Sequence, residues 1–225
     1  MNINELRSLY STELTFNNYY EKVEASNDVW LVLMYEPNSD ASINFMNVWD
    51  SIGEKLNSTI KMGRINAIKE KDLYGLLPIK PKFYPFIYLW APQKPYELLR
   101  IEEATNTDQM LRMVREIMSA YVTSVAYDNS ADFFGYKKPN ENTEAFNRFS
   151  ISIASKKNLS PTIFLKLAMK YSNIINFGSI AFHDRSKIIR RYDCEIEHNV
   201  LIGYDAAPNK RKVISGTIEQ MTYPI

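Results

Sequence analysis

Few side chains in this chain of 225 residues have the chemistry for covalent catalysis. Cys194 is the single cysteine, so no internal disulfide, cysteine-based zinc site or CxxC redox pair can form. It follows Arg190 and Arg191 and precedes His198, and nearby cations of this kind can lower the pKa of a thiol and make it reactive. A lone cysteine is more often an unreactive packed or exposed thiol, and we favour that role here.

The two histidines add little further chemistry. With only His183 and His198 available, a histidine-rich metal site is not expected. His183 and Asp184 are adjacent, which resembles a catalytic dyad, but no nucleophile is spaced to use them. The chain has seven glycines and neither a GxGxxG nor a GxxxxGK(S/T) motif, so we expect no phosphate-binding loop and no cofactor.

The composition is that of an ordinary globular chain, with 45% hydrophobic and 24% charged residues. The formal net charge of +1 argues against a nucleic-acid partner or an anionic membrane surface. The most apolar stretch, residues 29–35, is too short to span a bilayer, and no signal-peptide pattern follows Met1, so no membrane insertion is expected in this segment. The length suits one large or two ordinary domains.

The first half of the chain alternates strand-like and helix-like patterns. Residues 28–35 form a continuous apolar run, which predicts a strand buried on both faces. Apolar residues then recur at helical spacing over 45–56, which predicts an amphipathic helix. Gly75 is expected to close a short helix in the left-handed conformation, and Thr107 to cap a later one. The remaining elements predicted here are strands at 14–15, 59–65, 86–90 and 96–101, and helices at 16–23, 69–74 and 108–121.

The second half repeats this order of elements. Ser160 is predicted to cap a helix that begins at Pro161 and buries Ile163, Leu167, Ala168 and Tyr171. We therefore predict an α/β protein of two tandem domains, 1–121 and a divergent, shorter 122–225, each with a central mixed sheet flanked by helices. The elements predicted in the second half are strands at 122–126, 149–154, 177–182, 200–204 and 212–214, and helices near 133–134, at 161–171 and at 186–194.

This order of elements resembles the thioredoxin fold, and the first half is similar to the thioredoxin and protein disulfide isomerase pattern. That family ends its central strand with phenylalanine, tyrosine, alanine, proline and tryptophan, followed by CxxC. The corresponding stretch here is Met34–Asn38, followed by Ser39, Asp40, Ala41 and Ser42. The other matching positions are Trp49 in the active-site helix, Lys61–Asn66 in the third strand, the pair Tyr74-Gly75, and Tyr84-Pro85 in the cis-proline segment.

Serine replaces cysteine at both reactive positions of that pattern. Thiol–disulfide exchange needs a thiolate, and a serine hydroxyl cannot form a mixed disulfide. The family also keeps a buried carboxylate six residues before the first cysteine, where this chain has Leu33. A hydrolytic role for Ser39 or Ser42 would need a histidine base, and the first domain contains no histidine. We therefore expect residues 39–42 to be a vestigial site without thiol–disulfide oxidoreductase activity.

The resemblance implies that the shape of the site survives as a peptide-binding groove. In the family, the backbone beside the cis-proline pairs with an extended polypeptide, which is a form of β-augmentation. The candidate groove residues are Tyr35, Asn38, Tyr84 and Pro85. The alternative is that Tyr35 and Tyr84 only pack the domain. The second domain has His198-Asn199-Val200 where a cis-proline would lie, so a scaffolding role is expected for it.

Basic residues gather in the sequence of the second domain. They are Lys187, Arg190, Arg191 and the run Lys210-Arg211-Lys212. A solvated surface is the favoured interpretation of these residues, and binding of acidic partners is the alternative.

The resemblance implies a non-catalytic module that binds client polypeptides or partner chaperones in protein folding or quality control. Similar modules follow the J-domain of some endoplasmic-reticulum co-chaperones, which implies a location in the endoplasmic-reticulum lumen. No histidine-proline-aspartate motif occurs here, so a J-domain that recruits a heat-shock chaperone would lie outside this segment. The alternative is a cytoplasmic thioredoxin-like scaffold or adaptor without a client groove. Glutathione transfer lacks support, because it would call for an all-helical second domain.

Overall fold

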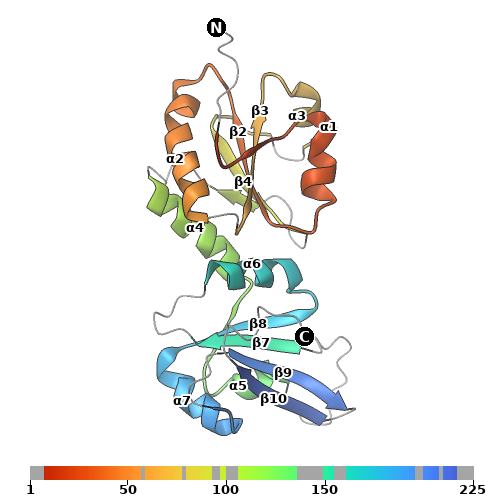
Figure 1. Cartoon of the computed structure of the whole chain (residues 1–225), viewed down its shortest axis with the longest axis vertical. Coiled ribbons are helices and arrows are strands. Elements are labelled where there is room, and N and C mark those ends of the chain that lie inside the picture. The colour runs from red at the N-terminus through yellow and green to blue at the C-terminus, as the bar shows by residue number, and fades with distance from the viewer. Residues whose placement is uncertain are drawn as a thin grey trace. The chain divides into compact units, whose positions relative to one another are not determined.

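The computed structural model describes residues 8–56, 59–77, 80–92, 97–99, 106–135, 149–154, 161–195, 200–207 and 210–216. The chain divides into two compact units, Met1–Ile117 and Met118–Ile225, and each is described by itself (Figure 1). The domain limits 1–121 and 122–225 stay a prediction.

The first unit is built on a five-stranded sheet in the order β1-β3-β2-β4-β5. β1, β3 and β2 run parallel, whereas β4 and β5 run antiparallel to them. The strands are β1 (Thr12–Glu13), β2 (Trp30–Tyr35), β3 (Lys61–Asn66), β4 (Phe86–Trp90) and β5 (Glu97–Leu99). The helices are α1 (Phe16–Tyr19), which continues as a π-helical turn (Tyr20–Glu24), α2 (Asp40–Leu56), α3 (Lys71–Leu76) and α4 (Thr107–Ser119).

The central strand β2 explains why the core of the first unit forms. All six of its residues are buried, as expected of a continuous apolar run between two helical layers. Side chains alternate between the two faces, so Trp30, Val32 and Met34 join the cluster beside α1 and α3. The other three residues of β2 point to the opposite face. α2 lies there and buries Phe45, Trp49 and Ile52, among others.

The second unit repeats this sheet, in the order β10-β9-β7-β8-β6. β6, β8 and β7 are parallel, and β9 and β10 are antiparallel, so the α/β fold with two thioredoxin-like mixed sheets is confirmed. The strands are β6 (Thr123–Val125), β7 (Phe149–Ala154), β8 (Ile175–Ile180), β9 (Val200–Ala207) and β10 (Lys210–Gly216). The helices are α5 (Ser130–Phe133), α6 (Thr162–Tyr171) and α7 (Phe182–Arg191).

The predicted ends of two helices in the first unit were wrong. Gly75 lies inside α3, which ends at Leu76 and is followed by Leu77 in an extended conformation, so no left-handed residue is needed there. Thr107 is the first residue of α4 and not its cap. Asn106 takes that role, because its side-chain oxygen accepts the backbone N–H of Gln109 at 3.0 Å. The strand predicted at 14–15 lies slightly earlier, as β1.

The predicted start of α6 and half of its predicted buried face were also wrong. Pro161 precedes the helix in an extended conformation, and Ser160 lies outside the described residues. Ala168 is buried and Tyr171 packs against the core as predicted, but Ile163 and Leu167 are exposed, and Phe164, Leu165 and Met169 are buried instead. The helix is apolar on almost every side, so the spacing of its apolar residues cannot identify the face that packs. Similarly, α7 begins four residues before its predicted start at 186.

Candidate functional site

The two serines at the cysteine positions lie where β2 ends and α2 begins. The backbone N–H of Ile43 donates to the carbonyl oxygen of Ser39 at 3.0 Å, and the N–H of Ser42 lies 3.5 Å from the Ser39 hydroxyl oxygen. Ser39 therefore occupies the capping position of α2. The hydroxyl oxygen of Ser42 is buried and accepts the backbone N–H of Glu36 at 3.2 Å. Both hydroxyls thus interact with the backbone of the loop and the first helical turn.

Tyr84 and Pro85, joined by a cis peptide bond, precede β4 next to this loop. Tyr84 packs against the α1 and α3 side of the core and is hydrogen-bonded to Tyr74 of α3. Partial burial raises the pKa of the Tyr84 hydroxyl to about 12, and the nearby Tyr74 hydroxyl and Glu36 carboxylate add to the rise. The effect of Glu36 on this pKa indicates that the proline segment lies near the β2–α2 loop.

The predicted groove residues do not all reach the surface. Asn38 is exposed, and Tyr84 and Pro85 are partly exposed, so these three remain available to a ligand. Tyr35, in contrast, is 0% exposed and cannot line a groove. It lies on the face of β2 that α2 covers, and its hydroxyl donates to Glu13 Oε1 at 3.4 Å.

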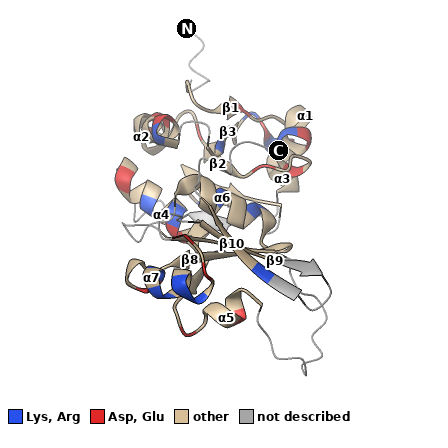
Figure 2. Ribbon diagram, turned by 60° about the horizontal axis from the view of Figure 1, so that its bottom comes forward, with Lys and Arg blue, Asp and Glu red and all other residues tan. Residues whose placement is uncertain are grey.

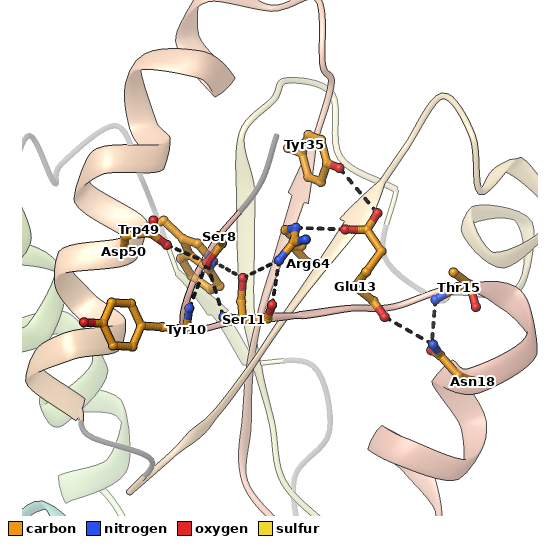
Figure 3. A network of polar contacts seen from close by, with 10 residues as sticks. All are labelled: Ser8, Tyr10, Ser11, Glu13, Thr15, Asn18, Tyr35, Trp49, Asp50 and Arg64. Atoms are coloured by element: carbon orange, nitrogen blue, oxygen red, sulfur yellow. Dashed lines mark hydrogen bonds and ion pairs between the residues drawn. The ribbon is translucent and has the colours of Figure 1, made fainter. Parts of the chain in front are cut away.

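A polar network surrounds Tyr35 under α2 (Figure 3). Arg64 of β3 lies 2.8 Å (Nε to Oε2) from Glu13 of β1, and its Nη1 donates to the carbonyl oxygen of Ser11 at 2.6 Å. The Ser11 hydroxyl oxygen also accepts the indole N–H of Trp49 at 3.0 Å. Burial raises the pKa of Tyr35 to about 12, and the Glu13 carboxylate adds to the rise.

The sequence interpretation missed this network, although one signal was present. Arg64 lies between Gly63 and Ile65 in the predicted strand 59–65, and a charged residue in a strand needs a partner once it is buried. The partner, Glu13, lies too far away in the sequence to be identified by spacing. Leu33, at the carboxylate position of the family pattern, is 0% exposed and pairs in register with Arg64. The charged pair therefore lies one strand away from the expected carboxylate position.

The cysteine and the histidine–aspartate pair of the second unit lie in surroundings that favour structural roles over catalytic ones. Burial raises the pKa of the Cys194 thiol, which is opposite to the shift that a reactive cysteine needs. Asp184 is buried and lies 3.5 Å (Oδ2 to Nε2) from the exposed His183, and it also accepts the backbone N–H of Tyr127. Asp184 therefore anchors the segment after β6. His198 lies outside the described residues.

A cavity of about 380 Å³ lies away from the serines, at the other end of the first sheet. Its walls include the first residues of β2 and β3, whereas the candidate site follows the last residue of β2. The residues that line it are Leu9, Tyr10, Thr12, Trp30, Gly53, Ile60, Lys61 and Met62.

The described residues include neither a membrane-spanning helix nor a metal-binding cluster. Within those residues, no helix is long and apolar enough to cross a membrane. The same residues hold no group of three or more histidine, cysteine, aspartate or glutamate side chains that could bind a metal ion.

The fold of this chain is similar to that of several solved structures. No family model and no curated protein matches the sequence. The chain is similar to full-length ERdj5, with 13% identity and a TM-score of 0.46 over 92% of this chain and 30% of that chain. It is similar to human ERp44 in its form II crystal, with 14% identity and a TM-score of 0.46 over 95% of this chain and 55% of that chain. It is also similar to the first two thioredoxin domains of Saccharomyces cerevisiae Eps1p, with 14% identity and a TM-score of 0.42 over 92% of each chain. The chain thus spans less than a third of the length of ERdj5.

Proposed function

We propose that this chain is a redox-inactive thioredoxin-like module that binds extended segments of client polypeptides in protein folding or quality control. The observation that carries the proposal is the use of the two serine hydroxyls at the start of α2. Ser39 lies at the helix cap and Ser42 holds the backbone N–H of Glu36, so both fulfil structural roles at the positions where exchange chemistry needs sulfur. What remains at this end of the sheet is a surface suited to binding.

The chemistry of that surface favours a particular kind of polypeptide. Phe83 is 73% exposed and Tyr84 is partly exposed, and aromatic rings supply large contact areas at low entropic cost. Glu36 adds a negative charge beside Tyr84. We therefore expect extended segments that carry an apolar residue next to lysine or arginine to bind best.

The experiment is a binding titration of the full chain with a fluorescein-labelled extended peptide that contains leucine next to lysine. Tyr84→Ala should weaken binding roughly tenfold, because part of an aromatic contact is lost. Tyr84→Phe keeps the ring and should bind nearly as well as the wild type. Tyr20→Ala removes an exposed ring elsewhere in the unit and serves as the matched control. Circular dichroism verifies that each variant is folded.

Equal binding by the Tyr84→Ala variant and the wild type would refute the groove and would favour the adaptor alternative. A peptide in which aspartate replaces lysine should bind more weakly, because Glu36 repels it. If both peptides bind equally, the role assigned to Glu36 is wrong.

We further propose the endoplasmic-reticulum lumen as the compartment, which rests on the resemblance stated from the sequence. Partner chaperones, among them a heat-shock chaperone recruited through a J-domain outside this segment, belong to the same proposal. Protease protection of the native gene product in isolated microsomes tests the compartment. Full digestion without detergent would place the chain on the cytoplasmic side and favour the adaptor role.

A further inference from the structure

The two sheets differ in how completely one of their faces is covered. Leu31 of β2 and Leu89 of β4 pair in register and are both 0% exposed. The corresponding pair in the second unit is Ile151 of β7 and Ile202 of β9, and both are only partly buried. The equivalent strands thus carry equally apolar side chains, but the second sheet leaves them closer to solvent.

The helices on this face explain the difference. In the first unit it is covered by the 17-residue α2, and α4 follows β5 and is tied to α2 by an ion pair of 2.6 Å between Lys55 and Asp108. In the second unit the 10-residue α6 occupies the place of α2. Among the described residues up to 216, no helix follows β10.

Large apolar side chains surround the uncovered part of this face. Ile214 of β10 pairs in register with Ile202 and is 48% exposed, and Phe149 at the start of β7 is also 48% exposed. Leu167 of α6 is 39% exposed. An exposed apolar surface of this kind is typical of a docking site for an amphipathic helix.

The charged residues around the face are mostly basic. α6 contains Lys166 and Lys170, and β10 begins with Lys210, Arg211 and Lys212. α6, β7 and β10 contain no aspartate or glutamate, and β9 contains one, Asp205, which pairs in register with Arg211. In Figure 2 the described part of β10 carries one blue stretch, because Lys212 is its basic residue. A ligand that covers the apolar side chains would therefore meet positive charge at its edges, which favours acidic partners.

We propose that this face of the second unit is the docking site for an acidic amphipathic helix of a partner polypeptide. The helix would lie where α4 lies in the first unit and would bury Ile202, Ile214 and Leu167 with its apolar side. Its acidic residues would face the lysines of α6 and Lys212 of β10. The site is independent of the groove in the first unit, so either can fail without the other.

The probes are synthetic peptides of residues 106–120, the sequence of α4 with its cap. An acidic version carries Arg112→Glu and Arg115→Glu, and a matched basic version carries Asp108→Lys and Glu116→Lys. Each is titrated into the full chain with isoleucine methyl groups labelled for NMR. We expect the acidic peptide to shift the methyl signals of Ile151, Ile202 and Ile214, and the basic peptide to bind at least tenfold more weakly.

Ile214→Thr should weaken binding of the acidic peptide roughly fivefold to tenfold, because part of an isoleucine side chain is no longer buried. Ile68→Thr changes an equally exposed isoleucine in the first unit and should leave the affinity unchanged. Four outcomes would overturn the proposal: no binding of either peptide, equal binding of both, shifts centred on the first unit, or an unchanged affinity in Ile214→Thr.

The same spectra would reveal whether this face of the second unit is instead covered by a second copy of the chain or by the chain's own C-terminal residues. Methyl shifts of Ile202 and Ile214 that depend on protein concentration would mean that a second copy covers the face. If the peptide binds only after residues 217–225 are deleted, the chain itself covers the face. Either result contradicts docking of a partner helix.

Discussion

The two units place a glycine at the same point of the same sheet. Gly63 of β3 pairs with the first residue of β1, and Gly178 of β8 pairs with the first residue of β6. A Cβ atom on Gly63 would lie 2.3 Å from a side-chain atom of Leu14, and one on Gly178 would lie 2.5 Å from the ring of Phe133. In both units, the absence of a side chain at this glycine therefore allows a large apolar side chain to pack directly against the sheet.

One residue further along, the two units diverge. Glu13 pairs in register with Arg64 in the first unit, and Ser124 pairs with Ser179 in the second. The two units therefore share the mixed sheet, but among the described residues only the first has the charged network of Glu13, Arg64 and Tyr35. The sheet does not require this network. The network connects β1 to β3 through Glu13 and Arg64. Tyr35, which also belongs to it, is the last residue of β2 before the β2–α2 loop. The first unit therefore has a fixed polar support beneath its candidate site.

The largest effect is expected from Arg64→Ala, which removes the arginine from its ion pair with the Glu13 carboxylate. Breaking a buried ion pair in this way should lower the free energy of unfolding of the first unit by about 3 kcal/mol, the lower end of the usual range because Glu13 is partly exposed. All three tryptophans lie in the first unit, so urea unfolding followed by tryptophan fluorescence reports on that unit. Ser179→Ala, the register equivalent, should leave this signal unchanged.

The exposed ion pair of Lys55 and Asp108 provides a second control for this prediction. Lys55→Ala should leave the unfolding midpoint unchanged, because solvent screens the pair. A loss in Lys55→Ala as large as that in Arg64→Ala would show that burial is not the reason for the effect.

Gly63→Ala and Gly178→Ala test the mixed sheet that the two units share. Each should cost roughly 1–3 kcal/mol, because the added methyl group collides with a packed side chain in its own unit. Tryptophan fluorescence should detect only the Gly63→Ala change, whereas far-UV circular dichroism should detect both. Gly75→Ala, where a Cβ would meet nothing within 4 Å, is the matched control. An unaltered midpoint in either core variant would contradict the equivalence of the two sheets.

Ser42→Ala should cost about 1 kcal/mol, since the backbone N–H of Glu36 loses its acceptor. Ser51→Ala, on the same helix and partly buried, should cost less. If the two variants have the same stability, the Ser42 hydroxyl has no structural role, and the replacement of cysteine by serine needs another explanation.

Alkaline pH should weaken the first unit. The pKa of Tyr35 is raised from 10.0 to about 12, so ionisation is disfavoured in the folded state. Its contribution to stability is complete below pH 10 and is lost as the pH rises from 10 towards 12. Tyr35→Phe should make that part of the profile less steep, measured as the urea midpoint between pH 9 and 11.5, and the raised pKa of Tyr84 should account for slope that remains. A profile that Tyr35→Phe leaves unchanged would contradict the burial of this hydroxyl.

The sequence was sufficient to predict the order of strands and helices, but it was not sufficient to predict the polar contacts between them. The apolar run of β2 and the spacing of Phe45, Trp49 and Ile52 predicted the central strand and α2 correctly, because each pattern fits only one element. The face of α6 was mispredicted because that helix is apolar on nearly all sides. Tyr35 was assigned to a groove, although strand alternation places it on the same face as Leu33, under α2.

Contacts between residues that are far apart in the sequence could not be predicted either. The contact between Glu13 and Arg64 joins residues that no local pattern relates, and it forms only because β1 pairs with β3. The same holds for Tyr84 and Glu36, whose proximity depends on the connection into β4. Strand order had to be known before either contact could be stated.

The most direct test of the account is the reduction of insulin by dithiothreitol in the presence of the full chain. The account predicts a rate equal to that of dithiothreitol alone, unchanged by Cys194→Ser. The double variant Ser39→Cys and Ser42→Cys should gain a measurable rate, because it restores sulfur at the start of α2. Catalysis by the wild-type chain above the background rate would contradict the account.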